Sequence, residues 1–289
     1  MKTRMMIVLT LAVLIVSSAV TFAAIAEDAR KIAESNKNAV VTVSLVIETT
    51  ASYEGESNKR EGKMSATGTV IDPSGLVVTS LTAINPSDMF SQYMDEDEGY
   101  KVSTKVIDVK IRTADGTEIP ADVVLRDRDL DLGFIKPKKA PDAPMSYVDL
   151  TQAGTPDMMD ELVLLNRLGQ VGSRALAGTV DRVQAVVTKP RTFYVLSSSV
   201  SGMGYPAFVA DGKPAGILTM RLSQNMDDNE GSLGGMDKVL AVVLPCSTVQ
   251  KAAEQAKTAK PIKEESPKPA EAKPAAKPNA PKPALKPAK

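Results

Sequence analysis

The sequence offers several nucleophilic and acidic side chains but no imidazole to activate them. Serines cluster at residues 197–199 and at Ser201, Asp131 begins an Asp-Leu pair, and Cys246 is the single cysteine. Histidine does not occur among the 289 residues. Its absence rules out Ser-His-Asp and Cys-His mechanisms and zinc sites built on imidazole. A Ser–Lys pair stays chemically open, because a buried lysine with a lowered pKa can act as a base.

The remaining polar clusters do not indicate a metal or cofactor site. One cysteine excludes an intramolecular disulfide and cysteine-rich metal or iron–sulfur sites. Because Cys246 follows the apolar run Val239–Leu244, we expect a buried, inert thiol. The acidic runs Asp95–Glu98 and Asp227–Glu230 lack the alternating ligands and downstream glutamate of a calcium loop, which favours solvated loops. We therefore expect no metal and no cofactor.

Both ends of the chain differ in composition from its body. Residues 1–26 have a cationic start, an apolar stretch and a small-residue end before Glu27, the layout of a cleaved signal peptide. An uncleaved membrane anchor is the alternative, because the apolar stretch is nearly long enough to span a bilayer. In either case we expect the body, residues 27–256, to be exported to the periplasm or outside the cell. Residues 257–289 form a Lys/Pro/Ala tract that we expect to be disordered.

The net charge of zero conceals an acidic body and a basic tail. Residues 27–256 hold 24 basic and 32 acidic side chains, a net charge of −8, whereas residues 257–289 have a net charge of +6. An acidic body argues against nucleic acid as a partner. The tail is interpreted either as a spacer or as an electrostatic tether to anionic envelope polymers or phospholipid headgroups.

Hydrophobic periodicity predicts an all-β body with a short helix at each end. Apolar residues alternate with polar ones in many short runs, which are separated by turns such as Asp72–Gly75 and Ala114–Gly116. Strands are expected near residues 41–47, 66–71, 76–79, 107–111, 119–125, 131–135, 161–166, 175–184, 192–196, 207–210, 215–220 and 239–244. The helices are expected at residues 27–36 and 247–256. The proline-rich segment Lys136–Met145 divides this body into two lobes, at about residues 37–136 and 145–256.

Three segments in order resemble the trypsin-like (chymotrypsin-fold) serine peptidases of the HtrA/Deg type. Ala66–Ile84 resembles the first-lobe block, in which a Pro-x-Gly turn joins two apolar strands before the catalytic His. Val123–Lys136 resembles the block that contains Asp-Leu-Ala-x-Leu-Lys. Ser201–Ile217 resembles Gly-Asn-Ser-Gly-Gly-Pro-Leu and the hairpin after it. The resemblance covers the whole body and implies a two-lobed, trypsin-like double β-barrel.

The same resemblance implies a degenerate catalytic site. The His position of the family falls on Thr82, the nucleophile position on Met203, and the second Gly of the nucleophile motif on Tyr205, so that only the acid, Asp131, remains. Threonine is no base near neutral pH, and a thioether has no proton to lose. We therefore expect a non-catalytic member of the family, a pseudoprotease. Asp131 is expected to be structural and to hydrogen-bond Thr82 or nearby backbone amides.

A peptide-binding cleft is what the resemblance leaves once catalysis is lost. Family members hold an extended peptide against a strand edge beside the nucleophile loop, and this pairing needs no triad. Gly202 and Gly204 flank Met203, so the loop can turn tightly, while Met203 and Tyr205 would occupy the cleft. The cleft is interpreted either as a retuned pocket for a peptide or an unfolded envelope protein, or as filled dead space.

Two other functions stay open at this point. One is an active serine-type endopeptidase that uses Ser201 or a neighbour with a base other than His. The other is a structural envelope protein that is tethered by its basic tail and has a passive body.

Overall fold

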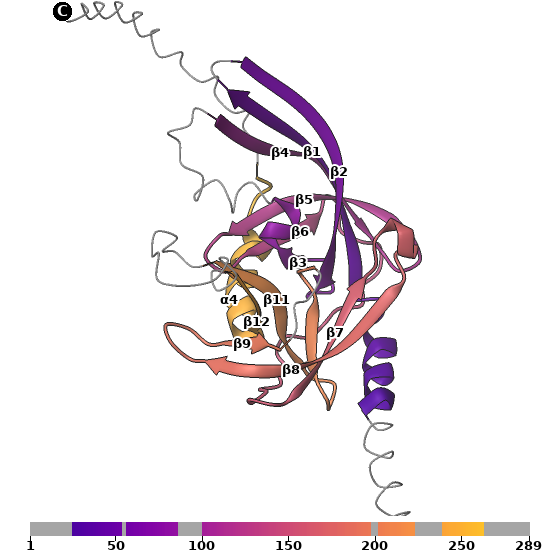
Figure 1. Cartoon of the computed structure of the whole chain (residues 1–289). Coiled ribbons are helices and arrows are strands. Elements are labelled where there is room, and N and C mark those ends of the chain that lie inside the picture. Colours follow the sequence, from indigo (N-terminus) through magenta and orange to yellow (C-terminus); the bar gives the residue numbers. More distant parts are fainter. Residues whose placement is uncertain (1–24, 54–55, 86–99, 198–201, 223–238, 263–289) are drawn as a thin grey trace, which may run out of the picture.

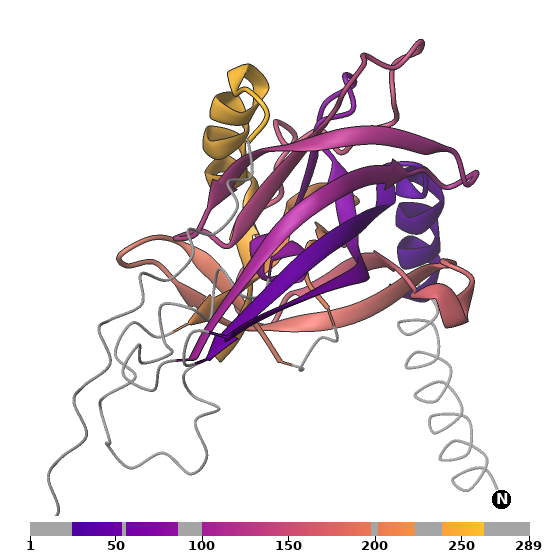
Figure 2. The same ribbon diagram turned by 90° about the horizontal axis from the view of Figure 1, so that it is seen from above.

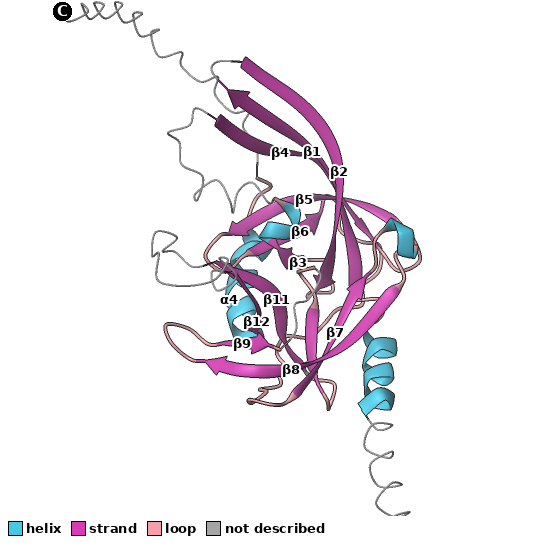
Figure 3. Cartoon of the chain, viewed as in Figure 1, coloured by secondary structure: helices cyan, strands magenta, loops and turns pink. Residues whose placement is uncertain are grey.

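The protein is built almost entirely of antiparallel β-strands, which close into two barrels (Figures 1 and 3). The computed structural model describes residues 25–53, 56–85, 100–197, 202–222 and 239–262. The expected all-β, two-barrel fold with short helices near both ends of the body is therefore confirmed. The acidic runs 95–98 and 227–230, Ser201, and nearly all of the proposed signal and tail lie outside the described residues.

The first barrel contains six strands in the closed order β1-β2-β3-β6-β5-β4. The strands are β1 (Val40–Tyr53), β2 (Glu56–Val70), β3 (Val77–Ser80), β4 (Tyr100–Arg112), β5 (Glu118–Asp127) and β6 (Leu132–Pro137). The predicted turn at Asp72–Gly75 is present, with the Gly75 N–H donating to Asp72 O at 2.9 Å and a Gly75 φ of 86°. Only glycine adopts such a φ without strain, so the Pro-x-Gly turn sets the junction of β2 and β3.

The second barrel repeats the strand order of the first. Its strands are β7 (Glu161–Arg167), β8 (Leu176–Val187), β9 (Phe193–Leu196), β10 (Pro206–Val209), β11 (Pro214–Leu222) and β12 (Val239–Pro245). Read from β7, they close as β7-β8-β9-β12-β11-β10, which matches the first barrel strand for strand. Two closed six-stranded antiparallel barrels of equal topology are consistent with a trypsin-like double-barrel fold.

Three long strands, β1, β2 and β4, exceed the predicted lengths and build an arm. β1 pairs with β2 as far as Tyr53–Glu56 and with β4 as far as Tyr53–Tyr100. The outer parts of β1, β2 and β4 therefore project from the barrel as a three-stranded ribbon (Figure 1). Residues 56–63 of β2 are all exposed and polar or glycine, so the alternation that marks a half-buried strand is absent there.

Short helices connect and cover the barrels. A leading helix spans residues 25–36, α2 (Leu81–Ile84) follows β3, a 3₁₀ turn η3 (Gln170–Gly172) follows β7, and α4 (Cys246–Thr258) follows β12. The leading helix and α4 lie apart on the surface of the barrel pair (Figure 2). α4 ends two residues later than predicted, and the Ile262 N–H then donates to Val123 O at 2.9 Å. Among the described residues, no helix has the length and apolar character needed to span a membrane.

Three apolar clusters hold the fold together, one in each barrel and one between them. Val77 belongs to the first-barrel cluster, whereas its neighbour Val78 belongs to the shared cluster between the barrels. In the same way, Val243 faces the second-barrel cluster, and Val242 faces the shared cluster. Strands at the junction are thus buried on both faces, and burial of this apolar area stabilises the pair of barrels.

Cys246 belongs to this shared cluster. Its side chain is 1% exposed, and its Sγ donates to Pro214 O at 3.2 Å. Burial raises the pKa of the thiol to about 12, so the reactive thiolate is scarce at neutral pH. The expectation of a buried thiol is confirmed.

We predict that Gly216→Ala destabilises the protein by about 3 kcal/mol, because a Cβ at this position would lie 1.7 Å from Leu244 O on the neighbouring strand. Gly169→Ala is the matched control, since a Cβ there meets no atom within 4 Å. Urea unfolding of both variants measures the difference. Equal midpoints would show that β11 and β12 do not approach as closely as described.

Candidate functional site

Asp131 is the centre of the candidate site and is almost completely buried. It lies between β5 and β6, has a φ of 53° and is 1% exposed. Its Oδ1 accepts hydrogen bonds from the Thr82 N–H at 2.7 Å and the Thr82 hydroxyl at 2.9 Å. Its Oδ2 accepts from the Ser80 hydroxyl at 2.6 Å and the Met220 N–H at 2.8 Å. The carboxylate is therefore held by four donors of the protein itself.

The elements around Asp131 are shaped by these bonds. Ser80 ends β3 and caps α2, because its Oγ also accepts from the Ala83 N–H at 3.3 Å. The Leu81 N–H donates to the backbone oxygen of Asp131 at 3.0 Å. A four-residue helix is too short to be stable alone, so its position depends on these contacts. The bond from Met220, on β11, extends the same network into the second barrel.

The electrostatics of Asp131 reflect two opposing effects. Burial raises the pKa of the Asp131 carboxyl above its usual range, and the four donated hydrogen bonds oppose this rise by favouring the charged form. Thr82 directs its hydroxyl to the carboxylate. A hydroxyl in this role is a hydrogen-bond donor, so the arrangement holds α2 in place.

Met203 lies in the segment before β10, between two glycines with positive φ. Gly202 has a φ of 122° and is exposed, and Gly204 has a φ of 86° and is buried. Met203 is half-buried and packs against the apolar cluster of the second barrel. Both glycines are required sterically, because a Cβ on Gly202 would lie 1.8 Å from the Tyr205 hydroxyl and a Cβ on Gly204 would lie 2.4 Å from Thr79 Oγ1.

Gly204 and Tyr205 join the candidate loop to the rest of the molecule. The Gly204 N–H donates to Leu218 O at 2.8 Å, and Gly204 O accepts from the Thr69 hydroxyl, in the first barrel, at 3.2 Å. Tyr205 is 5% exposed and its side chain hydrogen-bonds Asn166, while burial raises the pKa of its phenol. Of the four residues proposed to line a cleft, Gly202 and Met203 are accessible, and Gly204 and Tyr205 are buried.

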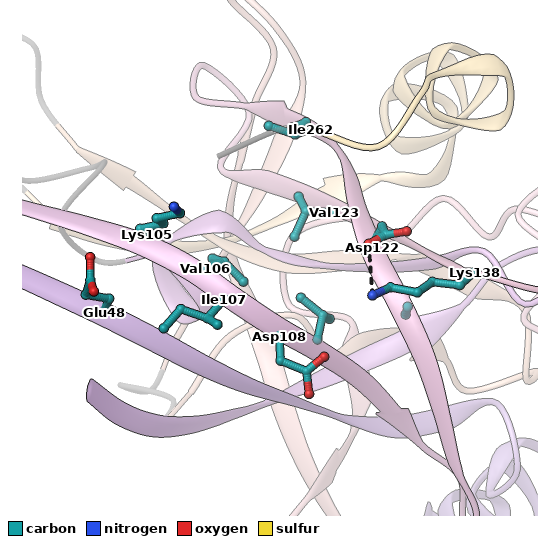
Figure 4. Close-up of a pocket in the computed structure, with 11 residues that line it drawn as sticks. Glu48, Lys105, Val106, Ile107, Asp108, Asp122, Val123, Lys138 and Ile262 are labelled. Carbon is teal, nitrogen blue, oxygen red and sulfur yellow. Dashed lines mark ion pairs between the residues drawn. The ribbon is translucent and has the colours of Figure 1, made fainter. Parts of the chain in front are cut away.

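Of the serines at residues 197–199 and 201, the structure describes only Ser197. Ser197 donates its hydroxyl to Asp181 Oδ1 at 2.5 Å, whereas Ser201 lies outside the described residues. A cavity of about 590 Å³ lies between β4 and β5, and neither Thr82 nor Met203 lines it. Figure 4 shows this cavity, with Lys138 paired to Asp122 at 3.5 Å on one wall. Among the described residues, no group of three or more His, Cys, Asp or Glu side chains forms a metal site.

Sequence comparison adds no family assignment to this picture. No protein-family model matches the chain, and no curated protein matches it.

Sequence reasoning connected Asp131 with Thr82 but missed Ser80 and Met220. Ser80 had a recognisable signal, since a serine that precedes a short helical turn is a favoured N-cap. Met220 had none, because it contributes a backbone N–H from a strand 89 residues away.

We predict that Asp131→Asn destabilises the protein by about 1–3 kcal/mol at neutral pH. The amide can accept from Thr82 at its oxygen, but its NH₂ would face the Met220 N–H, which leaves a buried donor without an acceptor. Urea unfolding measures the loss. Asp142→Asn is the control, because Asp142 is exposed; equal effects of the two changes would contradict a structural role for Asp131.

This cost should depend on pH in a defined direction. Because the pKa of Asp131 is raised by folding, ionisation removes stability as the pH rises from the unfolded value of about 3.9 through the higher folded value. We compare the free energy of unfolding of the natural protein with that of Asp131→Asn. The difference is therefore largest at pH values below the unfolded pKa. It falls between the unfolded and the folded pKa and is constant at higher pH. A difference that grows with rising pH would show that folding lowers the pKa instead.

Proposed function

We propose that the chain is a non-catalytic, HtrA/Deg-like serine-peptidase homologue of the cell envelope that binds an extended peptide or protein segment beside Gly202 and Met203. The observation that carries the proposal is the set of hydrogen bonds that Asp131 accepts. Its carboxylate, at the family's acid position, is engaged by Ser80, Thr82 and Met220, which are all parts of the fold.

The absence of histidine supports the non-catalytic part of the proposal. In a Ser-His-Asp triad the acid orients the imidazole, and the imidazole takes the proton of the nucleophile. Here the carboxylate of Asp131 instead accepts a hydrogen bond from the Thr82 hydroxyl. The sequence contains no histidine. Met203 stands where the nucleophile would, and its thioether cannot attack a carbonyl group as a hydroxyl or thiol does.

The accessible part of the loop supports the binding part. Gly202 is exposed and Met203 half-buried, so a ligand at this place would contact a flexible, polarizable side chain that adapts to different partners. Gly204 and Tyr205 are buried and hold the loop against both barrels. A loop fixed in this way is preorganised, which lowers the entropic cost of binding.

The envelope location rests on the sequence pattern at residues 1–26 and on the order of the three family-like segments. An exported, acidic, two-barrel body with a basic tail suits a soluble binding protein of that compartment.

The first test is turnover of an unfolded protein substrate by the full chain. We expect no cleavage above the level of Ser201→Ala, while a trypsin-like peptidase in the same assay degrades the substrate. Cleavage that is lost in Ser201→Ala would overturn the non-catalytic assignment and indicate a lysine or carboxylate base.

The second test measures binding of an unfolded protein to the full chain. The unfolded protein is reduced, alkylated and fluorescently labelled, and its fluorescence anisotropy reports binding. We predict that Met203→Ala weakens binding by about fivefold or more, the effect typical of a central contact residue. Met158→Ala is the matched control, because Met158 is 60% exposed on the same barrel. Equal affinities of the two variants would contradict binding beside Met203 and leave the non-catalytic assignment in place.

A further inference from the structure

A small polar cavity lies at the junction of the barrels, away from the candidate site. Its volume is about 160 Å³. The first barrel contributes the end of β4 and the turn before β5, and the second barrel contributes the ends of the connection between β7 and β8. The lining side chains include Thr42, Arg112, Thr113, Arg167, Ser173 and Arg174. Because a water molecule occupies about 30 Å³ in the liquid, the cavity has room for one small polyatomic group.

The lining of the cavity contains more basic than acidic side chains. Three arginines line it, against one acidic residue, Asp115. The Asp115 carboxylate already accepts hydrogen bonds from the Thr113 hydroxyl and from the Thr117 N–H at 3.1 Å, which hold it in its own turn. A second carboxylate, that of Glu118, pairs with Arg112 at 3.4 Å and with Lys110 at 3.0 Å outside the lining.

Two of the arginines, Arg112 and Arg167, are held in place by other protein groups and still have N–H donors that these contacts do not use. Arg167 donates from Nε to Val40 O at 2.9 Å and from its guanidinium to Lys37 O, so it bridges the second barrel to the first. Within the described part of the chain, Arg112 pairs with Glu118. A guanidinium carries five N–H donors, so each of these side chains retains donors after its protein contacts are made. Anchored guanidinium groups are the usual recognition elements for oxyanions.

Of the three arginines, Arg174 is the one with a buried donor that lacks a partner within the described part of the chain. Its Nε is buried and has no hydrogen-bond partner there. Arg174 has a φ of 55° and the preceding Ser173 has a φ of 54°, so two successive non-glycine residues adopt the left-handed region. Such strain is uncommon and concentrates at functional sites. Buried donors normally have a hydrogen-bond acceptor. Because Arg174 lines the cavity, a ligand bound there could accept the hydrogen bond of its Nε–H.

We propose that this inter-barrel cavity binds a tetrahedral oxyanion of the phosphate or sulfate class, held by Arg174 together with Arg112 and Arg167. The anion supplies the acceptor that Arg174 Nε lacks and offsets the repulsion among three guanidinium groups. Because the arginines come from both barrels, the bound anion also joins the barrels. The anion is either a free ion or the phosphate of a lipid headgroup, since both present the same oxygens.

The test is thermal unfolding of the full chain in millimolar inorganic phosphate, against chloride at equal ionic strength. Binding to the folded state alone raises the Tm with phosphate concentration. We expect Arg174→Gly to keep the fold, because glycine favours this φ, and to weaken phosphate binding by about tenfold or more in calorimetry. Lys213→Ala is the control: it removes one positive charge from the same barrel, at a side chain that is 55% exposed and outside the cavity.

Each outcome decides the proposal. A Tm shift in the natural protein and in Lys213→Ala, lost in Arg174→Gly, supports the site; equal shifts in all three proteins, or no shift, overturn it. Vesicles of phosphatidylglycerol distinguish the sources. Cosedimentation that is lost in Arg174→Gly assigns the site to a headgroup, and a phosphate shift without cosedimentation assigns it to the free ion.

Discussion

Removing a carboxylate from water is costly unless donors inside the protein replace its hydration. Asp131 keeps four donors, from the end of β3, from α2 and from β11. The first two elements belong to one barrel and the third to the other, so all four bonds form only when the barrels adopt one relative position. The network thus links the N-cap of α2 to the relative position of the two barrels.

Further polar contacts also join the two barrels. The Thr69 hydroxyl donates to Gly204 O at 3.2 Å, and Thr67 Oγ1 accepts from the Arg167 N–H at 3.1 Å. The side chain of Arg167 then reaches Val40 O. Apolar burial drives the barrels together without fixing a direction, whereas these directional bonds select one register between them. The same division of roles explains why arginines and threonines gather at the junction.

The order and approximate position of the strands could be predicted, because alternation and turn residues are local signals. Such signals predicted the turn at Gly75 and the helix α4. The outer part of β2 could not be predicted, since its exposed residues, such as Lys59 and Arg60, show no alternation of apolar and polar side chains. In the site, the Asp131–Thr82 contact came from a family resemblance. Met220 and the three-arginine cavity depend on contacts between distant segments, which periodicity does not encode.

A buried acid stays necessary to this fold whether or not it has a base to orient. In a working triad the acid must leave one acceptor direction for an imidazole. Here the directions at both oxygens are taken by hydroxyl and amide donors of the fold, and Met203 packs into the second barrel. Asp131, Ser80 and Thr82 thus satisfy one another's hydrogen-bonding groups inside the fold. The four hydrogen bonds of Asp131 therefore give this carboxylate a structural role at the junction of the two barrels.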